Sequence, residues 1–167
     1  MSMTRTNARE IAVQLGFSVL APDVTAQQLV EDFFEPEHYA SLAEESELYK
    51  DKPGKQLEFI LASVQGVMDY RLQLDEYITK YAKDWRVERI DRTAQAILRQ
   101  AMFEILYLPD IGTATSINEA VEMAKGYEDP EVVAFINGVL GGFVRGEGIA
   151  ENPASSAESE TAEAPEA

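Results

Sequence analysis

The feature that most constrains the fold is a helical pattern from Val87 to Tyr107, which neither proline nor glycine interrupts. Its apolar side chains recur at intervals of three and four residues, the spacing of one face of an α-helix. These positions are Ile90, Ala94, Ile97, Leu98, Ala101, Met102, Ile105 and Leu106. A stripe this wide is covered by several helices rather than by one, so this segment is predicted to be the central helix of an all-helical fold.

The rest of the chain also has helical patterns, without a strand pattern or an internal repeat. The other predicted helices cover residues 4–20, 26–34, 39–48, 117–125 and 130–143. Thr25 with Gln28, and Ser116 with Glu119, have the spacing of capping boxes, in which both side chains satisfy free backbone donors at a helix start. The chain is therefore predicted to be all-α.

Two further segments have local signals. Between residues 56 and 82 the apolar pattern changes phase, which predicts either two helices or one kinked helix. Asp129 is predicted to cap the last helix, with Pro130 at its first position, where the missing N–H costs nothing. Three glycines within residues 138–142 each cost about 1 kcal/mol in a helix, so close helix packing is expected to offset them.

The composition fits one globular domain over residues 1–146, because 167 residues with 46% hydrophobic content can bury a core. The absence of cysteine excludes disulfides and suits a reducing cytoplasm. No signal peptide is recognisable, and no apolar run reaches the roughly 18 residues of a membrane span. Residues 147–167 are acidic and poor in large apolar side chains, so they are predicted to form a disordered tail.

The net charge of −16 argues against nucleic acid as a ligand, since phosphate binding depends on lysine and arginine. The charge is uneven, however. Between Lys80 and Arg99, six basic residues face three acidic ones, whereas residues 23–47 contain eight acidic side chains and no basic one. A local basic face is compatible with this pattern, although long-range attraction of RNA is weak.

The sequence does not predict a catalytic or a metal site. The single histidine, His38, follows Glu35 at the spacing found in carboxylate-bridged iron bundles, but the pair occurs once and contains Pro36. There is no glycine-rich phosphate loop after a strand and no motif that places a serine nucleophile beside this histidine. We expect neither an enzyme nor a cofactor.

A family resemblance is carried by four segments, AREIAVQLGFS (8–18), WRVERIDRTAQAILRQAMFEILY (85–107), SINEAVEMAK (116–125) and FINGVLGGF (135–143). In order and spacing they look like the NusB family of transcription antitermination factors. The resemblance implies a bundle of about seven helices in two packed sub-bundles, without enzymatic activity. It also implies binding to boxA RNA of nascent ribosomal RNA transcripts together with NusE, a small ribosomal subunit protein, in an RNA polymerase antitermination complex.

The RNA surface of that family begins at a basic N-terminus that leads into the first helix. The side chains retained there are Arg5, Arg9, Gln14 and Phe17. Thr6 and Asn7 stand where family members often have basic residues. The resemblance implies that the arginines bind phosphate and that Phe17 stacks on an unpaired base. The alternative for Phe17 is a core position on this helix.

The second part of the implied RNA surface is the start of the last helix. Phe135 matches the family motif there, and Lys125 is retained at the end of the preceding helix. Family members often have a basic residue shortly before the phenylalanine, where this chain has residues 132–134, Val-Val-Ala. The alternative for Phe135 is core packing, and for Asn118 and Asn137 we expect hydrogen bonds between helices.

The implied partner surface departs from the family pattern. Ala94 lies where family members usually have an acidic residue that contacts NusE, and Gln95 follows it. A charged contact reduced to alanine loses its orienting effect. Asp91 and Arg92, one turn earlier, are the predicted substitutes.

Three interpretations remain open at this point. The first is an RNA-binding antitermination factor acting with NusE, and the second is a protein-interaction module that keeps the NusB fold with weakened RNA binding. The third is a relative of the helical domain at the front of certain RNA cytosine methyltransferases. Salt-dependent affinity for boxA RNA separates the first two. Family members occur as monomers and as homodimers, and both states remain open for this chain.

Overall fold

The computed structural model describes residues 2–17, 23–83 and 90–150. These residues form eight α-helices and two short 3-10 helices, and the only strand-like pairing among them is an isolated bridge between Ser2 and Lys52. The predicted all-α class is confirmed. None of the described helices is long and apolar enough to cross a membrane.

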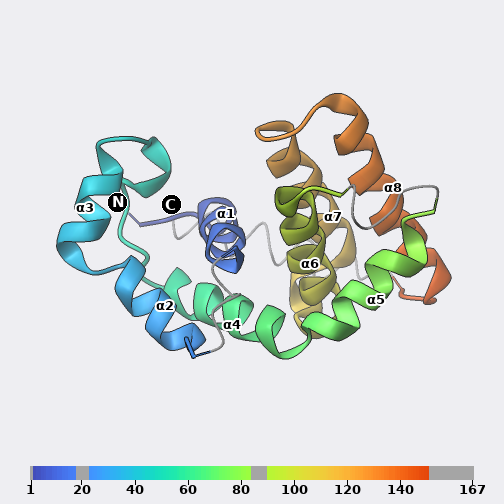
Figure 1. Ribbon diagram of the computed structural model, residues 1–167, viewed down its shortest axis with the longest axis horizontal. Coiled ribbons are helices and arrows are strands. Elements are labelled where there is room, and N and C mark those ends of the chain that lie inside the picture. Colours follow the sequence, from blue (N-terminus) through green and yellow to red (C-terminus); the bar gives the residue numbers. More distant parts are fainter. Residues whose placement is uncertain (1, 18–22, 84–89, 151–167) are drawn as a thin grey trace.

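The first four α-helices form one sub-bundle (Figure 1). They are α1 (Arg5–Gly16), α2 (Ala26–Phe33), α3 (Pro36–Ala43) and α4 (Gln56–Asp69), with a 3-10 turn at Glu47–Tyr49 before α4. Their shared core includes the fully buried side chains of Met3, Ile11 and Ile60. Thr25 caps α2 as predicted, because its hydroxyl oxygen accepts a hydrogen bond from the Gln28 backbone amide at 3.1 Å. The other half of the predicted capping box is not formed, since the Gln28 side chain donates to Asp32 at 2.8 Å.

The last four α-helices form a second sub-bundle beside the first (Figure 1). They are α5 (Arg71–Tyr81), α6 (Arg92–Tyr107), α7 (Thr113–Lys125) and α8 (Pro130–Gly146). A larger core fills this half and includes Leu74, Leu98, Met102, Ile136 and Phe143. The predicted organisation in two sub-bundles is confirmed.

Helix α6 is the central element, as predicted, since it packs against α1, α4, α5, α7 and α8. Its start differs from the prediction. Asp91 is the N-cap, and its carboxylate accepts from the Ala94 amide at 2.8 Å, so the helix begins at Arg92 rather than at Val87. Residues 84–89 lie outside the described residues. With 16 residues, α6 is also shorter than α8, which has 17.

The phase change between residues 56 and 82 marks two helices, because the helical conformation is interrupted at Tyr70, between α4 and α5. The alternative of one kinked helix is wrong. Helix α1 ends at Gly16, and the predicted extension to residue 20 falls within residues 18–22, outside the described residues.

Helix α3 differs from the predicted helix at residues 39–48 at both ends. The sequence predicts that Pro36 ends a helix, but Pro36 is also the first residue of the next one, where its missing N–H costs nothing. The Glu35 carboxylate accepts from the His38 amide at 2.9 Å and so caps this helix.

Helix α8 begins as predicted, with Pro130 as its first residue after Asp129 at the N-cap position, but the Asp129 side chain makes no capping hydrogen bond. Its glycines do not all have the close packing that the sequence predicts. A methyl group at Gly142 would meet the Tyr81 ring at 3.6 Å, but one at Gly138 would meet nothing within 4 Å. Helix packing therefore does not explain Gly138.

The chain stays packed for four residues beyond the predicted domain boundary at residue 146. Glu147 accepts from the Lys80 amino group at 2.8 Å and from the Tyr81 hydroxyl, and Ile149 packs against the larger core. The rest of the predicted tail, residues 151–167, lies outside the described residues.

Candidate nucleic-acid interface

Arg9 crosses the junction between the two sub-bundles and is only 2% exposed. Its Nε donates to Glu104 of α6 at 2.8 Å, and its Nη1 lies 3.2 Å from Glu119 of α7. Its guanidinium also lies 5.5 Å from the centre of the Phe59 ring. The protein encloses this charge, and Arg9 forms ion pairs between helices. This differs from the predicted phosphate contact, which needs an exposed guanidinium.

The Glu104 carboxylate accepts hydrogen bonds from three side chains in this junction. Besides Arg9, they are Gln100, at 3.0 Å from Nε2, and Ser116, at 3.0 Å from its hydroxyl. Glu104 and Gln100 are also buried, and Gln100 donates further to Ser63 of α4 at 2.9 Å. The network joins α1, α4, α6 and α7. The Glu104 carboxylate at its centre accepts hydrogen bonds from side chains on α1, α6 and α7.

The predicted capping box at Ser116 and Glu119 is wrong, because both side chains make tertiary contacts. Ser116 donates to Glu104, and Glu119 accepts from Thr6 at 2.8 Å as well as pairing with Arg9. Helix α7 begins at Thr113, four residues before the predicted start at residue 117, and follows Gly112, whose φ of 92° suits a glycine.

The outer face of α1 is joined to the end of α7 through Gln14. Its Oε1 accepts from the Tyr49 hydroxyl at 2.6 Å, and its Nε2 donates to the Tyr127 hydroxyl at 3.2 Å. Tyr127 in turn donates to Glu10 at 2.5 Å, and burial together with this hydrogen bond raises the pKa of Tyr127 to about 12. Phe17 follows α1 and is 37% exposed, so its alternative as a core residue is wrong.

Tyr49 and Tyr127 were not predicted as site residues. Tyr49 ends the 3-10 turn before α4 and Tyr127 follows α7, so neither belongs to an α-helical stripe and periodicity gives no signal for either. Tyr127 is 44% exposed and lies two residues after Lys125. The structure therefore brings Gln14, Phe17 and Lys125 to neighbouring ends of α1 and α7, where exposed rings accompany polar groups.

A groove of about 590 Å³ runs between the end of α7 and the start of α8. It is lined by Val121, Lys125, Glu128, Pro130, Val133, Ala134 and Asn137. The Lys125 amino group is exposed and lies 3.0 Å from Glu122. Phe135 is half-buried and packs against the larger core, which supports the core-packing alternative for this residue. Asn137, by contrast, lines the groove.

The expected hydrogen bonds of Asn118 and Asn137 between helices are not found. Both side chains are exposed, and neither has a hydrogen-bond partner among residues 2–17, 23–83 and 90–150. Exposed amides at these positions remain available to a ligand.

The predicted partner residues lie at the start of α6. Asp91 and Arg92 are exposed, but Ala94 is fully buried in the larger core. Its methyl group therefore contacts the protein's own interior, contrary to the predicted partner contact, and only Asp91 and Arg92 can meet a partner from this turn.

Glu128 connects the start of α6 to the groove. Burial, followed by a hydrogen bond to Asp91 and the negative charges of Asp91 and Asp129, raises the pKa of Glu128 to about 7. The folded protein thus holds this proton more tightly than the unfolded chain does, and the resulting contribution to stability is lost as the pH rises through 7.

Glu128→Gln is therefore expected to have nearly the native free energy of unfolding at about pH 4 and to exceed it by about 1 kcal/mol at about pH 8, after allowance for solvent screening. Urea unfolding at both pH values measures this difference. Glu131→Gln, at an exposed acid of the first turn of α8, is the charge-matched control. An equal change in both variants would show that Asp91 has no special effect on Glu128.

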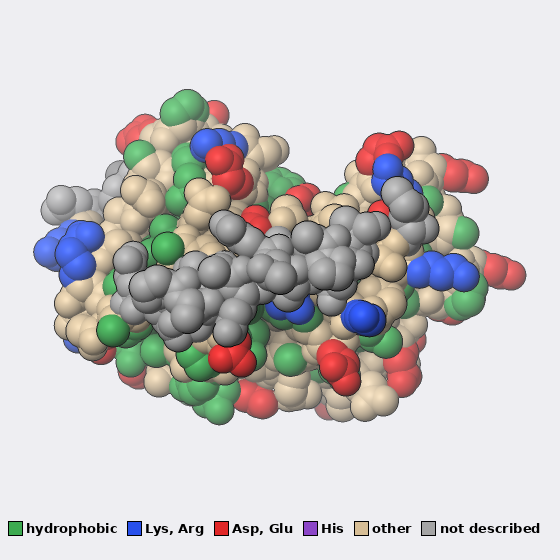
Figure 2. All heavy atoms as spheres, turned by 180° about the vertical axis from the view of Figure 1, so that it is seen from behind, with side chains coloured by type: hydrophobic (Ala, Val, Ile, Leu, Met, Phe, Trp, Pro, Cys, Tyr) green, Lys and Arg blue, Asp and Glu red, His purple; other side chains and the backbone are tan. Residues whose placement is uncertain are grey.

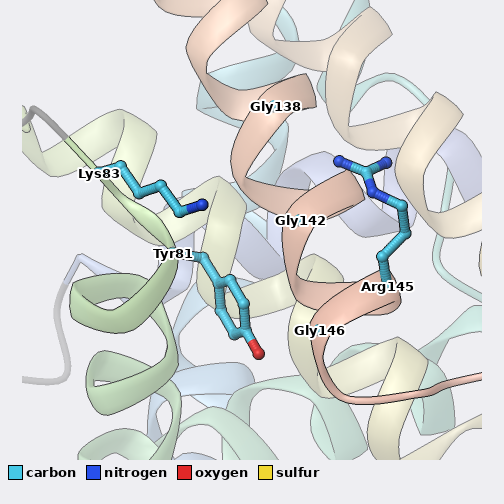
Figure 3. Close-up of a pocket in the computed structure, with 6 residues that line it drawn as sticks. All are labelled: Tyr81, Lys83, Gly138, Gly142, Arg145 and Gly146. Atoms are coloured by element: carbon cyan, nitrogen blue, oxygen red, sulfur yellow. The ribbon is translucent and has the colours of Figure 1, made fainter.

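A second groove, of about 390 Å³, lies between the end of α5 and α8. Figure 3 shows the Tyr81 ring against the glycine side of α8 and the Lys83 amino group directed toward this helix. Arg145 also lines it. Within the described part of the chain, no group of three acidic, histidine or cysteine residues is placed to hold a metal ion. His38 lies apart from these grooves, with Nδ1 2.9 Å from the Phe33 carbonyl oxygen.

Comparison with known proteins assigns the chain to a family. The model of the NusB family matches residues 6–145. Transcription antitermination protein NusB of Thermoanaerobacter sp. (strain X514) is 36% identical over 150 residues, which cover 89% of this chain and 96% of that protein. The NusB protein of Bacillus subtilis (strain 168) is 35% identical over 138 residues, with 83% and 92% covered.

A solved structure of T. maritima NusB has the same fold, with a TM-score of 0.62 at 24% identity, covering 87% of this chain and 93% of that one. The matched residues include both sub-bundles and the ends of α1, α7 and α8 that form the surface described above. This chain belongs to the NusB family.

Proposed function

We propose that this protein is a transcription antitermination factor that acts in the cytoplasm and has no catalytic activity. In this role it binds boxA-type RNA of nascent ribosomal RNA transcripts together with NusE, within an antitermination complex of RNA polymerase. The proposal rests on membership of the NusB family and on relatives that are named transcription antitermination proteins.

The observation that supports an RNA ligand best is the surface where α1 meets the end of α7. Phe17 and Tyr127 expose 37% and 44% of their surface, and Gln14 lies beside Tyr127. Aromatic rings of this kind stack on unpaired bases, and amide groups can read base edges. Lys125 and Asn137, on the groove between α7 and α8, extend the surface with a cation and an amide.

We also propose that NusE binds the start of α6. The exposed pair Asp91 and Arg92 offers one acceptor and one forked donor to a protein partner. Because Asp91 also contacts Glu128 of the groove, the partner and RNA surfaces adjoin. Binding of one ligand beside the other is therefore expected to be cooperative.

The second candidate function is a NusB-fold interaction module with weak or lost RNA binding. Enclosure of Arg9 favours it, because one of the two retained N-terminal arginines is withdrawn from solvent. Among the described residues that Figure 2 shows, the lysine and arginine side chains lie in small separate groups. A net charge of −16 also opposes the approach of RNA.

Phe17→Ala is expected to weaken binding of boxA-type RNA about fivefold, since one stacking contact at the surface contributes about 1 kcal/mol. Fluorescence anisotropy of a labelled oligonucleotide, with and without NusE, measures the change. Leu72→Ala is the control, because Leu72 is 82% exposed on α5 and belongs to neither groove nor stacking surface.

The unmodified protein decides between the two candidate functions in the same assay. RNA binding that strengthens with NusE and weakens between about 50 mM and about 200 mM salt supports the antitermination role. A folded, helical protein that binds no RNA in either condition would favour the interaction module instead.

A further inference from the structure

The N-terminus is fastened to the loop that precedes α4. Ser2 forms a parallel bridge with Lys52, and the Met3 amide donates to the Lys52 carbonyl oxygen at 3.3 Å. Met3 is fully buried, and the Tyr39 hydroxyl donates to the Asp51 carbonyl oxygen at 2.7 Å. The loop backbone is therefore held beside the residues that lead into α1.

The start of α4 lies against the first turn of α1 in the same region. Lys55 is the N-cap residue of α4, and the next residue, Gln56, is buried. The Gln56 Oε1 accepts from the Arg5 Nε at 2.6 Å, and the Arg5 guanidinium lies 4.3 Å from the centre of the Phe59 ring. Lys55 therefore directly precedes Gln56, whose side chain orients Arg5.

Three of the six lysines of this protein pair with a glutamate, and Lys52 and Lys55 are not among them in the part of the chain that the structure describes. Lys50, Lys80 and Lys125 each lie within 3.0 Å of a glutamate carboxylate. Lys52 and Lys55 are exposed, and neither has a carboxylate within 4.0 Å in the part of the chain that the structure describes. A phosphate can bind such an amino group without displacing an acidic side chain, which matters in a chain with 30 acidic and 14 basic residues.

From these contacts we propose that Lys52 and Lys55, together with Arg5, form a binding site for RNA backbone phosphates at the start of α1. The inference rests on the proposed function and identifies which residues of this chain carry the charge. Thr6 and Asn7 supply no cation at the first turn, and the loop before α4 brings two lysines there from about 50 residues away in sequence. These lysines lie outside the four segments that resemble the family.

The position of the site suits a single strand that runs along α1. Arg5 and Phe17 are the two ends of this helix and lie roughly 18 Å apart at about 1.5 Å per residue. Phosphate contacts at the first end position the strand, and stacking at the second end engages its bases. The lysines fix the path of the RNA and do not read its sequence.

The test compares two double variants that remove the same charge. Lys52→Gln/Lys55→Gln removes the proposed phosphate site. Lys83→Gln/Arg145→Gln removes two exposed cations from the groove between α5 and α8, in the other sub-bundle. All four side chains are exposed, so both variants are expected to fold, which circular dichroism checks. Affinity for boxA-type RNA and for a scrambled RNA is measured over a range of salt concentrations.

Lys52→Gln/Lys55→Gln is expected to weaken binding of both RNAs about tenfold and to reduce the slope of log affinity against log salt by about 1.4, since each lost phosphate contact on a single strand removes about 0.7. The control variant is expected to change affinity less than about twofold with an unchanged slope. Equal effects of the two variants, or no effect of the first, would overturn the inference while leaving the proposed function in place. A loss confined to boxA RNA would also overturn it, because phosphate contacts do not distinguish sequences. No RNA binding by the unmodified protein would overturn both.

Discussion

Glu104→Ala is expected to lower the free energy of unfolding by about 3–5 kcal/mol, the usual cost of removing one partner from a buried ion pair. The carboxylate accepts from Arg9 at 2.8 Å and from Gln100 and Ser116 at 3.0 Å each. Without it, the buried guanidinium loses the closer of its ion pairs with Glu104 and Glu119, and Glu119 is 15% exposed. Urea unfolding followed by circular dichroism measures the loss.

A second variant separates the ion pair from the packing. Arg9→Met/Glu104→Leu replaces both charges with apolar side chains and is expected to lose less stability than Glu104→Ala alone, because no buried charge remains unpaired. Ser116 and Gln100 then lose an acceptor, so the double variant is not expected to reach native stability. A cost below about 1 kcal/mol for Glu104→Ala would contradict a structural role for this junction.

The junction also changes how an Arg9→Ala variant would be interpreted. A loss of RNA binding in Arg9→Ala would reflect a damaged contact between α1, α6 and α7, since this side chain is almost fully enclosed. Variants of exposed residues such as Phe17 and Lys52 test the proposed RNA surface without this ambiguity.

Gly66→Ala is expected to destabilise the fold by about 3 kcal/mol, at the upper end of the usual cost of overpacking. A methyl group on Gly66 would overlap with the Phe103 ring, which is only 4% exposed. The ring also lies beside Tyr107, with centroids 5.8 Å apart, and has little room to move. Thermal and urea unfolding measure the effect, and Gly66→Ala/Phe103→Leu is expected to recover part of it.

Gly138→Ala is the matched control, because it makes the same change within a helix where a methyl group would meet nothing within 4 Å. It is expected to stabilise the protein by about 0.5–1 kcal/mol, the ordinary helix preference for alanine over glycine. If the two variants shifted stability in the same direction, the close approach of α4 and α6 at Gly66 would be refuted.

The helical class and several boundaries could be predicted from local sequence. The Thr25 cap and the start of α8 at Pro130 depend on neighbouring residues, and the structure has both as predicted. The phase change between residues 56 and 82 predicted either two helices or one kinked helix, and the structure has two helices that meet at Tyr70. Periodicity also identified α6 as the element that other helices cover, because a wide apolar stripe must be buried on several sides.

The failed predictions share a different cause. Ser116 and Glu119 have capping-box spacing, and Arg9 has the position of a surface cation, yet all three serve one buried network. Nothing within a few residues of Arg9 indicates Glu104, which is 95 positions away. Polar side chains can take local or distant partners, and a sequence pattern reports only the local ones.

The sequence by itself thus determined the helices, their apolar faces and the family, since these depend on residue type and on spacing within a few turns. The tertiary structure alone decided which polar residues lie inside and which stay exposed, because that choice depends on contacts between distant segments. It enclosed Arg9, joined Gln14 to Tyr127, and held Lys52 beside the N-terminus. Burial of a charge is stable only where partners from other helices converge on it, and those partners are assembled by folding.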